Sequence, residues 1–124
     1  MDRNDALLIV DVQNDFCPGG ALAVKDGDQV IAPLNRCIER FRAAGATIVA
    51  SRDWHPAQTM HFKAFGGVWP LHCVQGSHGA EIHAALRIDG DTTIISKGMA
   101  SNADSYSAFD GVDDAGQKLA ELLD

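Results

Sequence analysis

Three short apolar runs, rich in β-branched residues, occupy residues 6–10, 46–50 and 92–96 of the chain, and the strand predicted from the first run extends to about residue 12. Runs of this length and composition, each bounded by polar or glycine-rich segments, are typical of strands buried in a parallel sheet. We therefore expect three parallel strands at these positions.

Two further segments carry the features of helices. In the first, the apolar residues recur with the spacing of one helix face, at Leu34, Cys37, Ile38 and Phe41. Pro33 fits the first turn of such a helix, and Gly45 is placed to stop it. The second predicted helix spans residues 113–123, with Asp113 as its cap. Strands that alternate with helices predict an α/β fold, an open parallel sheet with flanking helices.

The length of 124 residues indicates a single domain that spans residues 1–124. The last predicted helix leads to no further strand, although a crossover helix normally delivers the chain to one. Three strands also leave an edge of a Val/Ile-rich sheet open to pairing with other chains. We therefore expect a domain that lacks its carboxyl-terminal part, or a chain completed by a partner.

Composition argues against several classes of partner. The formal net charge of −7 disfavours nucleic acid, because phosphate binding requires clustered Lys and Arg. No apolar run approaches the roughly 20 residues of a membrane helix, so no contact with a membrane is expected. The three cysteines, Cys17, Cys37 and Cys73, are odd in number and far apart, which favours a reducing compartment over a disulfide scaffold. These features predict a cytoplasmic protein.

Potential metal ligands gather after the second apolar run. Asp53 and His55 are two residues apart on an extended segment, so their side chains are expected on the same side. His61 and His72 follow in the same long loop. A carboxylate with two or three imidazoles suits Zn²⁺, Fe²⁺ or Mn²⁺ and leaves coordination positions open. The sequence predicts a divalent metal site, and the spacing does not distinguish the three metals.

The first apolar run stops at Asp11, and the third stops at Lys97. In open α/β sheets, reacting groups gather beyond the carboxyl ends of the strands. If the three strands are neighbours, Asp11 and Lys97 share one edge of the sheet with the metal candidates. Such a pair either transfers protons or only stabilises the strand ends as an ion pair, and its place at the strand ends favours the catalytic role.

Three aromatic residues, Phe16, Trp69 and Tyr106, fall in predicted loops rather than on a regular apolar stripe. Aromatic rings that line a pocket can stack on a planar ligand, whereas core aromatics usually follow helical or strand periodicity. We interpret the three as candidate substrate-binding residues, with ordinary packing as the alternative.

Four blocks of the sequence, in this order, resemble nicotinamidases, which are isochorismatase-like cysteine hydrolases. The blocks are LIVDVQNDFCPGGALAV at 8–24, SRDWHP at 51–56, WPLHCV at 69–74, and SKG at 96–98 with DSYSAF at 104–109. The resemblance implies a Rossmann-like three-layer fold and the hydrolysis of nicotinamide to nicotinate and ammonia, a reaction of NAD salvage.

The resemblance also implies roles for individual residues. It implies an Asp/Lys/Cys triad in which Asp11 is the base and Lys97 lies beside it. The implied metal ligands are Asp53, His55 and His72, with His61 as a further ligand in some members, and Phe16 and Trp69 flank the ring of the substrate. The nucleophilic cysteine of the family belongs to a later block that none of the three cysteines matches. We therefore expect this chain to lack the nucleophile.

Two alternatives remain open at this stage. One is a hydrolase that acts on another small amide or on isochorismate, although the retained histidines favour nicotinamide because members without the metal lack them. The other is a catalytically inactive metal-binding or interaction subunit, whose open sheet edge docks on a partner. A homo-oligomer or a complementing carboxyl-terminal segment would supply that partner.

Overall fold

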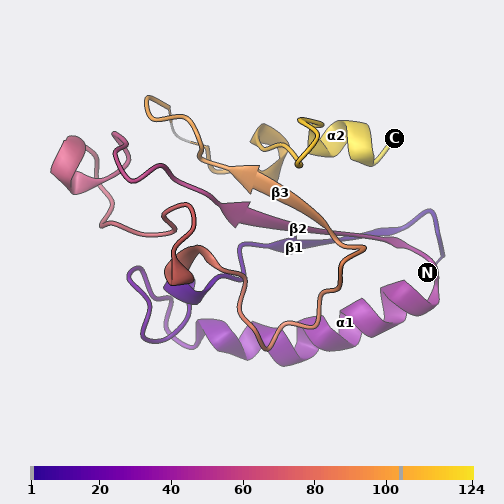
Figure 1. The fold of residues 1–124 in the computed structure, drawn as a ribbon. Helices are drawn as coiled ribbons and strands as arrows, with labels where there is room; N and C mark the ends of the chain where they lie inside the picture. Colours follow the sequence, from indigo (N-terminus) through magenta and orange to yellow (C-terminus); the bar gives the residue numbers. More distant parts are fainter. Residues whose placement is uncertain (1, 104) are drawn as a thin grey trace.

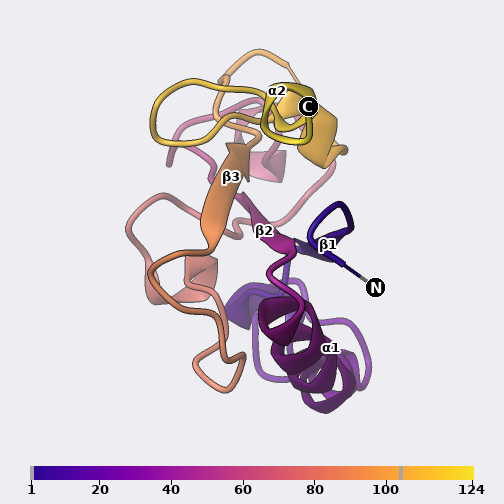
Figure 2. The same cartoon turned by 90° about the vertical axis from the view of Figure 1, so that its right-hand side faces the viewer.

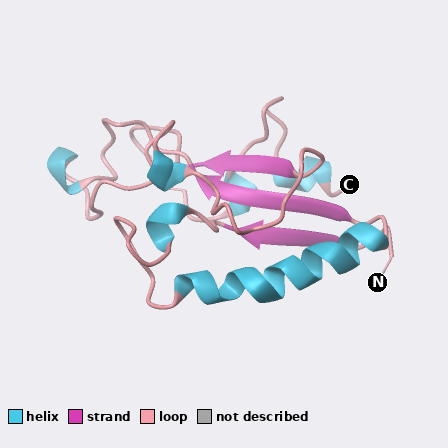
Figure 3. Cartoon of the chain, turned by 60° about the horizontal axis from the view of Figure 1, so that its bottom comes forward, coloured by secondary structure: helices cyan, strands magenta, loops and turns pink. Residues whose placement is uncertain are grey.

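A computed structural model describes residues 2–103 and 105–124 (Figure 1). Asp104, which belongs to the last of the four sequence blocks, lies outside the described residues. The strands β1 (Ala6–Val10), β2 (Thr47–Asp53) and β3 (Thr93–Lys97) form one sheet in the order β1-β2-β3. Both pairings are parallel, and all three strands point the same way (Figure 3). The prediction of three neighbouring parallel strands is therefore confirmed.

Helices lie on both faces of this sheet. The helix α1 (Ile31–Ala43) covers one face and the short helix α2 (Leu119–Leu122) lies on the other, with the sheet between them (Figure 2). The core under α1 consists of buried apolar residues from the sheet, the helix and the loops, namely Ile9, Val12, Ile31, Ile38, Ala50 and Leu86. A smaller cluster under α2 contains Val49, Ile95, Ala108 and Leu119. No helix among the described residues is long and apolar enough to cross a membrane.

The prediction of a helix over residues 113–123 is wrong for most of its length. The Asp113 carboxylate accepts hydrogen bonds from the backbone N–H groups of Ala115 at 3.0 Å and Gln117 at 2.8 Å, which closes a turn. Val112 and Lys118 then form an antiparallel bridge across that turn. Asp113 is therefore a turn residue rather than a helix cap, because its carboxylate binds the backbone in a non-helical conformation.

The strand ends also differ from the predicted ones. The first strand was expected to extend to residue 12 but ends at Val10, because Asp11 adopts a left-handed backbone with φ of 54° that no strand accommodates. β2 continues to Asp53 and β3 to Lys97. These two ionisable residues are thus the last residues of their strands, and the register places them opposite each other.

The long segment after β2 is ordered by short backbone pairings. The N–H of His55 donates to the carbonyl of Cys73 at 2.9 Å, and the N–H of Gln75 donates to the carbonyl of His55 at 2.8 Å. A second bridge joins Phe62 to Trp69. The loop therefore folds back on the end of β2 and carries residues 69–74 to the same edge of the sheet.

Candidate active site

The residues singled out in the sequence meet at the carboxyl ends of the strands. They all line one cavity of about 190 Å³. The predicted residues in its wall are Asp11, Phe16, Asp53, His55, His61, Trp69, His72, Lys97 and Tyr106. The structure thus gathers every candidate at one site, and their individual roles stay predictions.

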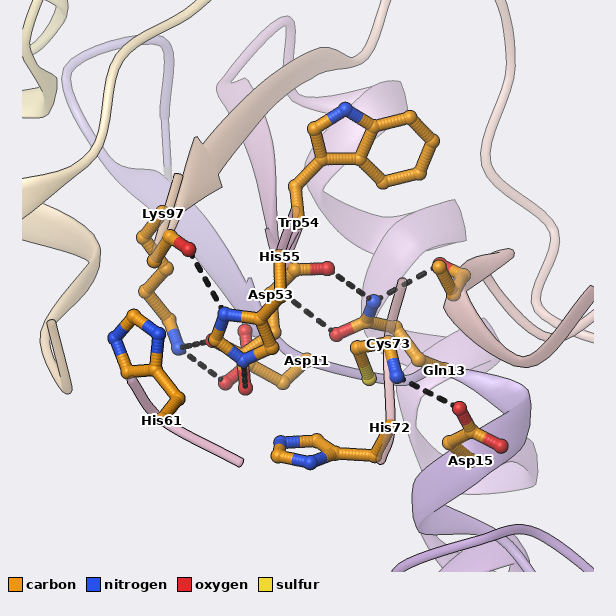
Figure 4. A network of polar contacts seen from close by, with 12 residues as sticks. Asp11, Gln13, Asp15, Asp53, Trp54, His55, His61, His72, Cys73 and Lys97 are labelled. Carbon is orange, nitrogen blue, oxygen red and sulfur yellow. Dashed lines mark hydrogen bonds and ion pairs between the residues drawn. The ribbon is translucent and has the colours of Figure 1, made fainter. Parts of the chain in front are cut away.

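The ammonium group of Lys97 lies between two carboxylates (Figure 4). Its Nζ is 2.8 Å from Oδ2 of Asp11 and 2.5 Å from Oδ1 of Asp53. The Lys97 side chain is 3% exposed, and this burial by itself would lower the pKa of the lysine. The hydrogen bonds and negative charges of the two carboxylates outweigh burial, so the pKa of Lys97 is raised above its ordinary value. The lysine is held in its charged form.

The carboxylate of Asp11 is fixed from two sides. The hydroxyl of Ser51, on β2, donates to Oδ1 of Asp11 at 2.7 Å, while Lys97 holds the other oxygen. The backbone N–H of Asp11 still donates to the carbonyl of Ser51 at 3.1 Å, so the turn after β1 begins directly at the sheet edge. A left-handed, non-glycine residue at a strand end is a form of backbone strain that is typical of functional sites.

Asp53, His55 and His72 form a group that could hold a metal ion. One potential ligand atom of each lies within 4.8 Å of those of the other two. Nδ1 of His55 donates to the carbonyl of Gly98 at 2.8 Å, and Nδ1 of His72 donates to the carbonyl of Pro70 at 2.7 Å. Because a carbonyl only accepts, each Nδ1 carries the proton, and in the neutral ring each Nε2 keeps a lone pair for a cation.

Burial supports the same protonation state. Desolvation lowers the pKa of His55, which favours the neutral imidazole that a metal requires. Nε2 of His55 lies 3.8 Å from Oδ2 of Asp53, close enough for one ion to bind both. Two imidazoles that each present Nε2 and a carboxylate, with backbone carbonyls behind the histidines, are a donor set that fits a divalent transition metal.

His61 lies beside this group rather than in it. Its ring centroid is 4.8 Å from that of His55, and its Nδ1 contacts the hydroxyl of Thr59. The group of three potential ligands found among the described residues does not include it. The expectation that His61 is a further ligand therefore stays a prediction.

The aromatic residues occupy different parts of the cavity. The ring of Phe16 lies 5.8 Å from that of His72, and the ring of Trp69 lies 6.4 Å from it, so both flank the metal group. Tyr106 is 70% exposed and lies at the mouth of the cavity. Phe16 and Trp69 are thus better placed than Tyr106 to enclose a planar ligand.

None of the three cysteines is in the wall of the cavity, although Cys73 lies close enough to Asp53, Asp11 and Lys97 to feel their charges. Cys73 is fully buried, and burial together with the charge of Asp53 raises the pKa of its thiol. Burial likewise raises the pKa of Cys17, with the charge of Asp28 adding to the effect. A thiol with a raised pKa and no access is a poor nucleophile. The structure offers no support for any cysteine of this chain in that role.

Sequence reasoning missed several residues that shape the site. Ser51 holds Asp11, Gly98 holds His55, and the side chain of Gln13 binds the backbone of Asp53. Leu22 and Ser105 also line the cavity. The signal for Ser51 was its place in the block SRDWHP, directly after the second apolar run. Gln13, Leu22, Gly98 and Ser105 also lie inside the blocks that resemble the family, but contacts between a side chain and a distant backbone leave no periodic pattern that would show their roles.

The comparison with protein families agrees with this geometry. The family model of the isochorismatase domain matches residues 5–124. The chain belongs to the isochorismatase family. The nicotinamidase of Escherichia coli (strain K12) is 43% identical over 119 residues, which cover 84% of this chain and 56% of that protein. The nicotinamidase/pyrazinamidase of Mycobacterium tuberculosis is 41% identical, covering 95% of this chain and 63% of that protein. The chain thus spans less than two thirds of the length of these isochorismatase-family relatives.

Solved structures show the same isochorismatase-like fold. The pyrazinamidase of Pyrococcus horikoshii in complex with zinc superimposes with a TM-score of 0.86 at 46% identity, covering 95% of this chain and 62% of that one. PnC1 of L. infantum in complex with nicotinate superimposes with a TM-score of 0.80 at 42% identity, covering 97% of this chain and 60% of that one. The predicted α/β fold with an open parallel sheet and flanking helices is confirmed.

Proposed function

We propose that this chain provides the substrate pocket, the proton-transfer pair and the metal ligands of an amidohydrolase that converts nicotinamide to nicotinate and ammonia. The observation that carries the proposal is the convergence of the Asp11–Lys97 pair and the metal group in one cavity of about 190 Å³, a size suited to a single-ring compound. Relatives at 41% and 43% identity that are named nicotinamidases support the choice of substrate.

In this proposal the ring of the substrate lies between Phe16 and Trp69, the two aromatic residues that flank His72. Asp53, His55 and His72 would hold a divalent cation, which would supply Lewis-acid chemistry beside the ring. The carboxamide then faces Asp11 and Lys97. Positioning of this kind is a large part of catalysis, because it replaces a random encounter by a fixed geometry.

Asp11 handles the protons of the reaction. It accepts the proton of a thiol nucleophile, which adds to the amide carbonyl, and it returns that proton to the nitrogen that leaves as ammonia. Water then hydrolyses the thioester, which releases nicotinate and restores the thiol. Lys97 keeps the Asp11 carboxylate in place at 2.8 Å and supplies positive charge beside the reacting carbonyl.

We further propose that the thiol comes from outside residues 1–124, because Cys17, Cys37 and Cys73 do not line the cavity. The free side of β1 is a suitable place for the segment that carries it. Leu8 is 36% exposed and Val10 56% exposed, and β1 is an edge strand of the described sheet. A carboxyl-terminal strand that pairs with this edge would bind its free backbone groups and pack beside both side chains, and a second copy of the chain is the alternative occupant.

The metal and the cellular setting belong to the same proposal. We favour Zn²⁺ over Fe²⁺ and Mn²⁺, because the pyrazinamidase of Pyrococcus horikoshii, with a similar fold, is a zinc complex. A role in NAD salvage in the cytoplasm follows from the proposed reaction, and the three free cysteines are in keeping with a reducing compartment.

The test joins this chain to the carboxyl-terminal part of the Escherichia coli nicotinamidase that it does not match, and measures ammonia released from nicotinamide with Zn²⁺ present. The fusion is expected to be active and residues 1–124 alone inactive. Asp11→Asn and Lys97→Met should abolish the activity of the fusion, whereas Lys63→Met, at an exposed lysine outside the cavity wall, should not.

Two results would count against the proposal. Ammonia release by residues 1–124 alone would place the nucleophile within this chain. A folded, zinc-binding fusion that cleaves isochorismate but not nicotinamide would show that the substrate is wrong.

A further inference from the structure

The side chain of Gln13 is completely buried although it ends in a polar amide. Its Nε2 donates to the backbone carbonyls of Asp53 at 2.8 Å and Ala80 at 2.9 Å. Its Oε1 accepts from the backbone N–H of Asp53 at 2.9 Å (Figure 4). Both polar groups of the Asp53 backbone are therefore bound by this one side chain.

This arrangement takes the place of a missing strand neighbour. β1 pairs with β2 only as far as Val10 and Ser51, because the backbone turns away at Asp11. The N–H and C=O of Asp53 point to the same side of β2 as those of Ser51, since alternate residues of a parallel strand bond to the same neighbour. The Gln13 amide fills the gap that β1 leaves there.

The bonds from Gln13 to the backbone of Asp53 also affect the position of the Asp53 side chain. Its Oδ1 binds Lys97 at 2.5 Å and its Oδ2 lies 3.8 Å from Nε2 of His55. A carboxylate is placed by its own backbone, so the two bonds from Gln13 restrict where this carboxylate can lie. Without them the end of β2 would be free to shift on its β1 side.

The loop after β1, which carries Gln13, also binds the segment that carries His72. Oδ2 of Asp15 accepts from the backbone N–H of Cys73 at 2.7 Å, and Cys73 has a left-handed backbone with φ of 47° directly after His72. Two side chains that are two residues apart, Gln13 and Asp15, therefore bind the backbones of both segments that supply metal ligands.

We propose that Gln13 is a positioning residue that sets the spacing of the metal group before an ion arrives, with Asp15 acting in the same way on the His72 segment. This inference rests on the proposed metal site. Groups behind the ligands of a metal commonly orient them and raise the affinity, because less ordering is left to occur on binding.

The experiment compares Zn²⁺ affinity, measured by competition with a chromophoric chelator, between the parent chain and Gln13→Met. Methionine preserves the length of the side chain and removes all three hydrogen bonds. The affinity is expected to fall about 10- to 100-fold. Urea unfolding of the metal-free proteins, followed by circular dichroism, separates this effect from loss of stability.

Asn35→Leu is the matched control. The amide of Asn35 also joins two backbone groups, because it donates to the carbonyl of Ala85 at 2.9 Å and accepts from the N–H of Arg87 at 2.7 Å. Asn35 lies on α1, outside the cavity wall. This variant should lose stability and keep the Zn²⁺ affinity of the parent.

Asp15→Leu provides a second test if Gln13→Met does not fold, because leucine has a similar size and accepts no hydrogen bond from the N–H of Cys73. A loss of Zn²⁺ affinity in either variant, with Asn35→Leu unaffected, supports the inference. Parental affinity in every folded variant of Gln13 and Asp15 would overturn it, as would an equal loss in Asn35→Leu. A parent chain that binds no Zn²⁺ would instead refute the proposed metal site, and the inference with it.

Discussion

Replacement of Gly98 by alanine tests the geometry of the site most directly. Gly98 follows Lys97 and has a left-handed backbone with φ of +69°. A Cβ atom there would lie 2.5 Å from Cε1 and 2.7 Å from Nδ1 of His55, far inside van der Waals contact. The carbonyl of Gly98 also accepts the hydrogen bond that orients this imidazole. The substitution therefore acts on the backbone and on a proposed metal ligand together.

The expected magnitude has two parts. A left-handed residue with a Cβ atom costs about 1–2 kcal/mol relative to glycine. A turn of the His55 ring by about 30° from its rotamer, to relieve the contact, adds about 0.5–1.5 kcal/mol. The sum predicts a loss of about 1.5–3.5 kcal/mol in the free energy of unfolding.

Gly45→Ala isolates the first part. Gly45 has nearly the same backbone, with φ of +70°, but a Cβ atom there would meet nothing within 4 Å. It should lose only about 1–2 kcal/mol in urea unfolding and bind Zn²⁺ like the parent. Gly98→Ala should lose more and bind Zn²⁺ about tenfold more weakly, or worse. Equal losses of stability in the two variants, with Zn²⁺ binding unaffected in both, would refute the reasoning.

Three further predictions concern charge, core packing and reactivity. Lys97→Met leaves the carboxylates of Asp11 and Asp53 facing each other without a cation, and should lower the free energy of unfolding by about 3–5 kcal/mol. Adding Asp11→Asn should restore part of this stability, because it removes one of the two negative charges. If it restores none, repulsion between the two carboxylates is not the cause of the loss. Ile38→Ala should cost about 2–5 kcal/mol in urea unfolding, because the side chain is fully buried under the sheet; a loss below this range would show that the core closes around the gap. Cys73 should resist alkylation by iodoacetamide in the native chain and react once urea unfolds it, because the thiol is buried and its pKa is raised. Peptide mapping by mass spectrometry measures the labelling, and alkylation of Cys73 in the native chain would contradict the prediction.

The accuracy of the sequence-based predictions depended on the range of the interactions involved. The β-branched runs and the stripe around Ile38 predicted the strands and α1, because side-chain periodicity reflects burial directly. The helix expected from residue 113 failed because a single Asp113 carboxylate, bonded to two backbone N–H groups, stabilises a turn instead. A local polar contact outweighed a weak preference for helix.

The sequence by itself determined which chemical groups stand at the strand ends, since Asp11, Asp53 and Lys97 each fall at or just after the end of an apolar run. Only the tertiary structure decided that one ammonium group pairs with both carboxylates, and that Gln13 replaces a strand beside Asp53. The physical reason is that hydrophobic patterning specifies which residues are buried and places the strands to within a few residues. Distances between atoms on different strands depend on register, backbone turns and side-chain conformation, which arise when the whole chain packs.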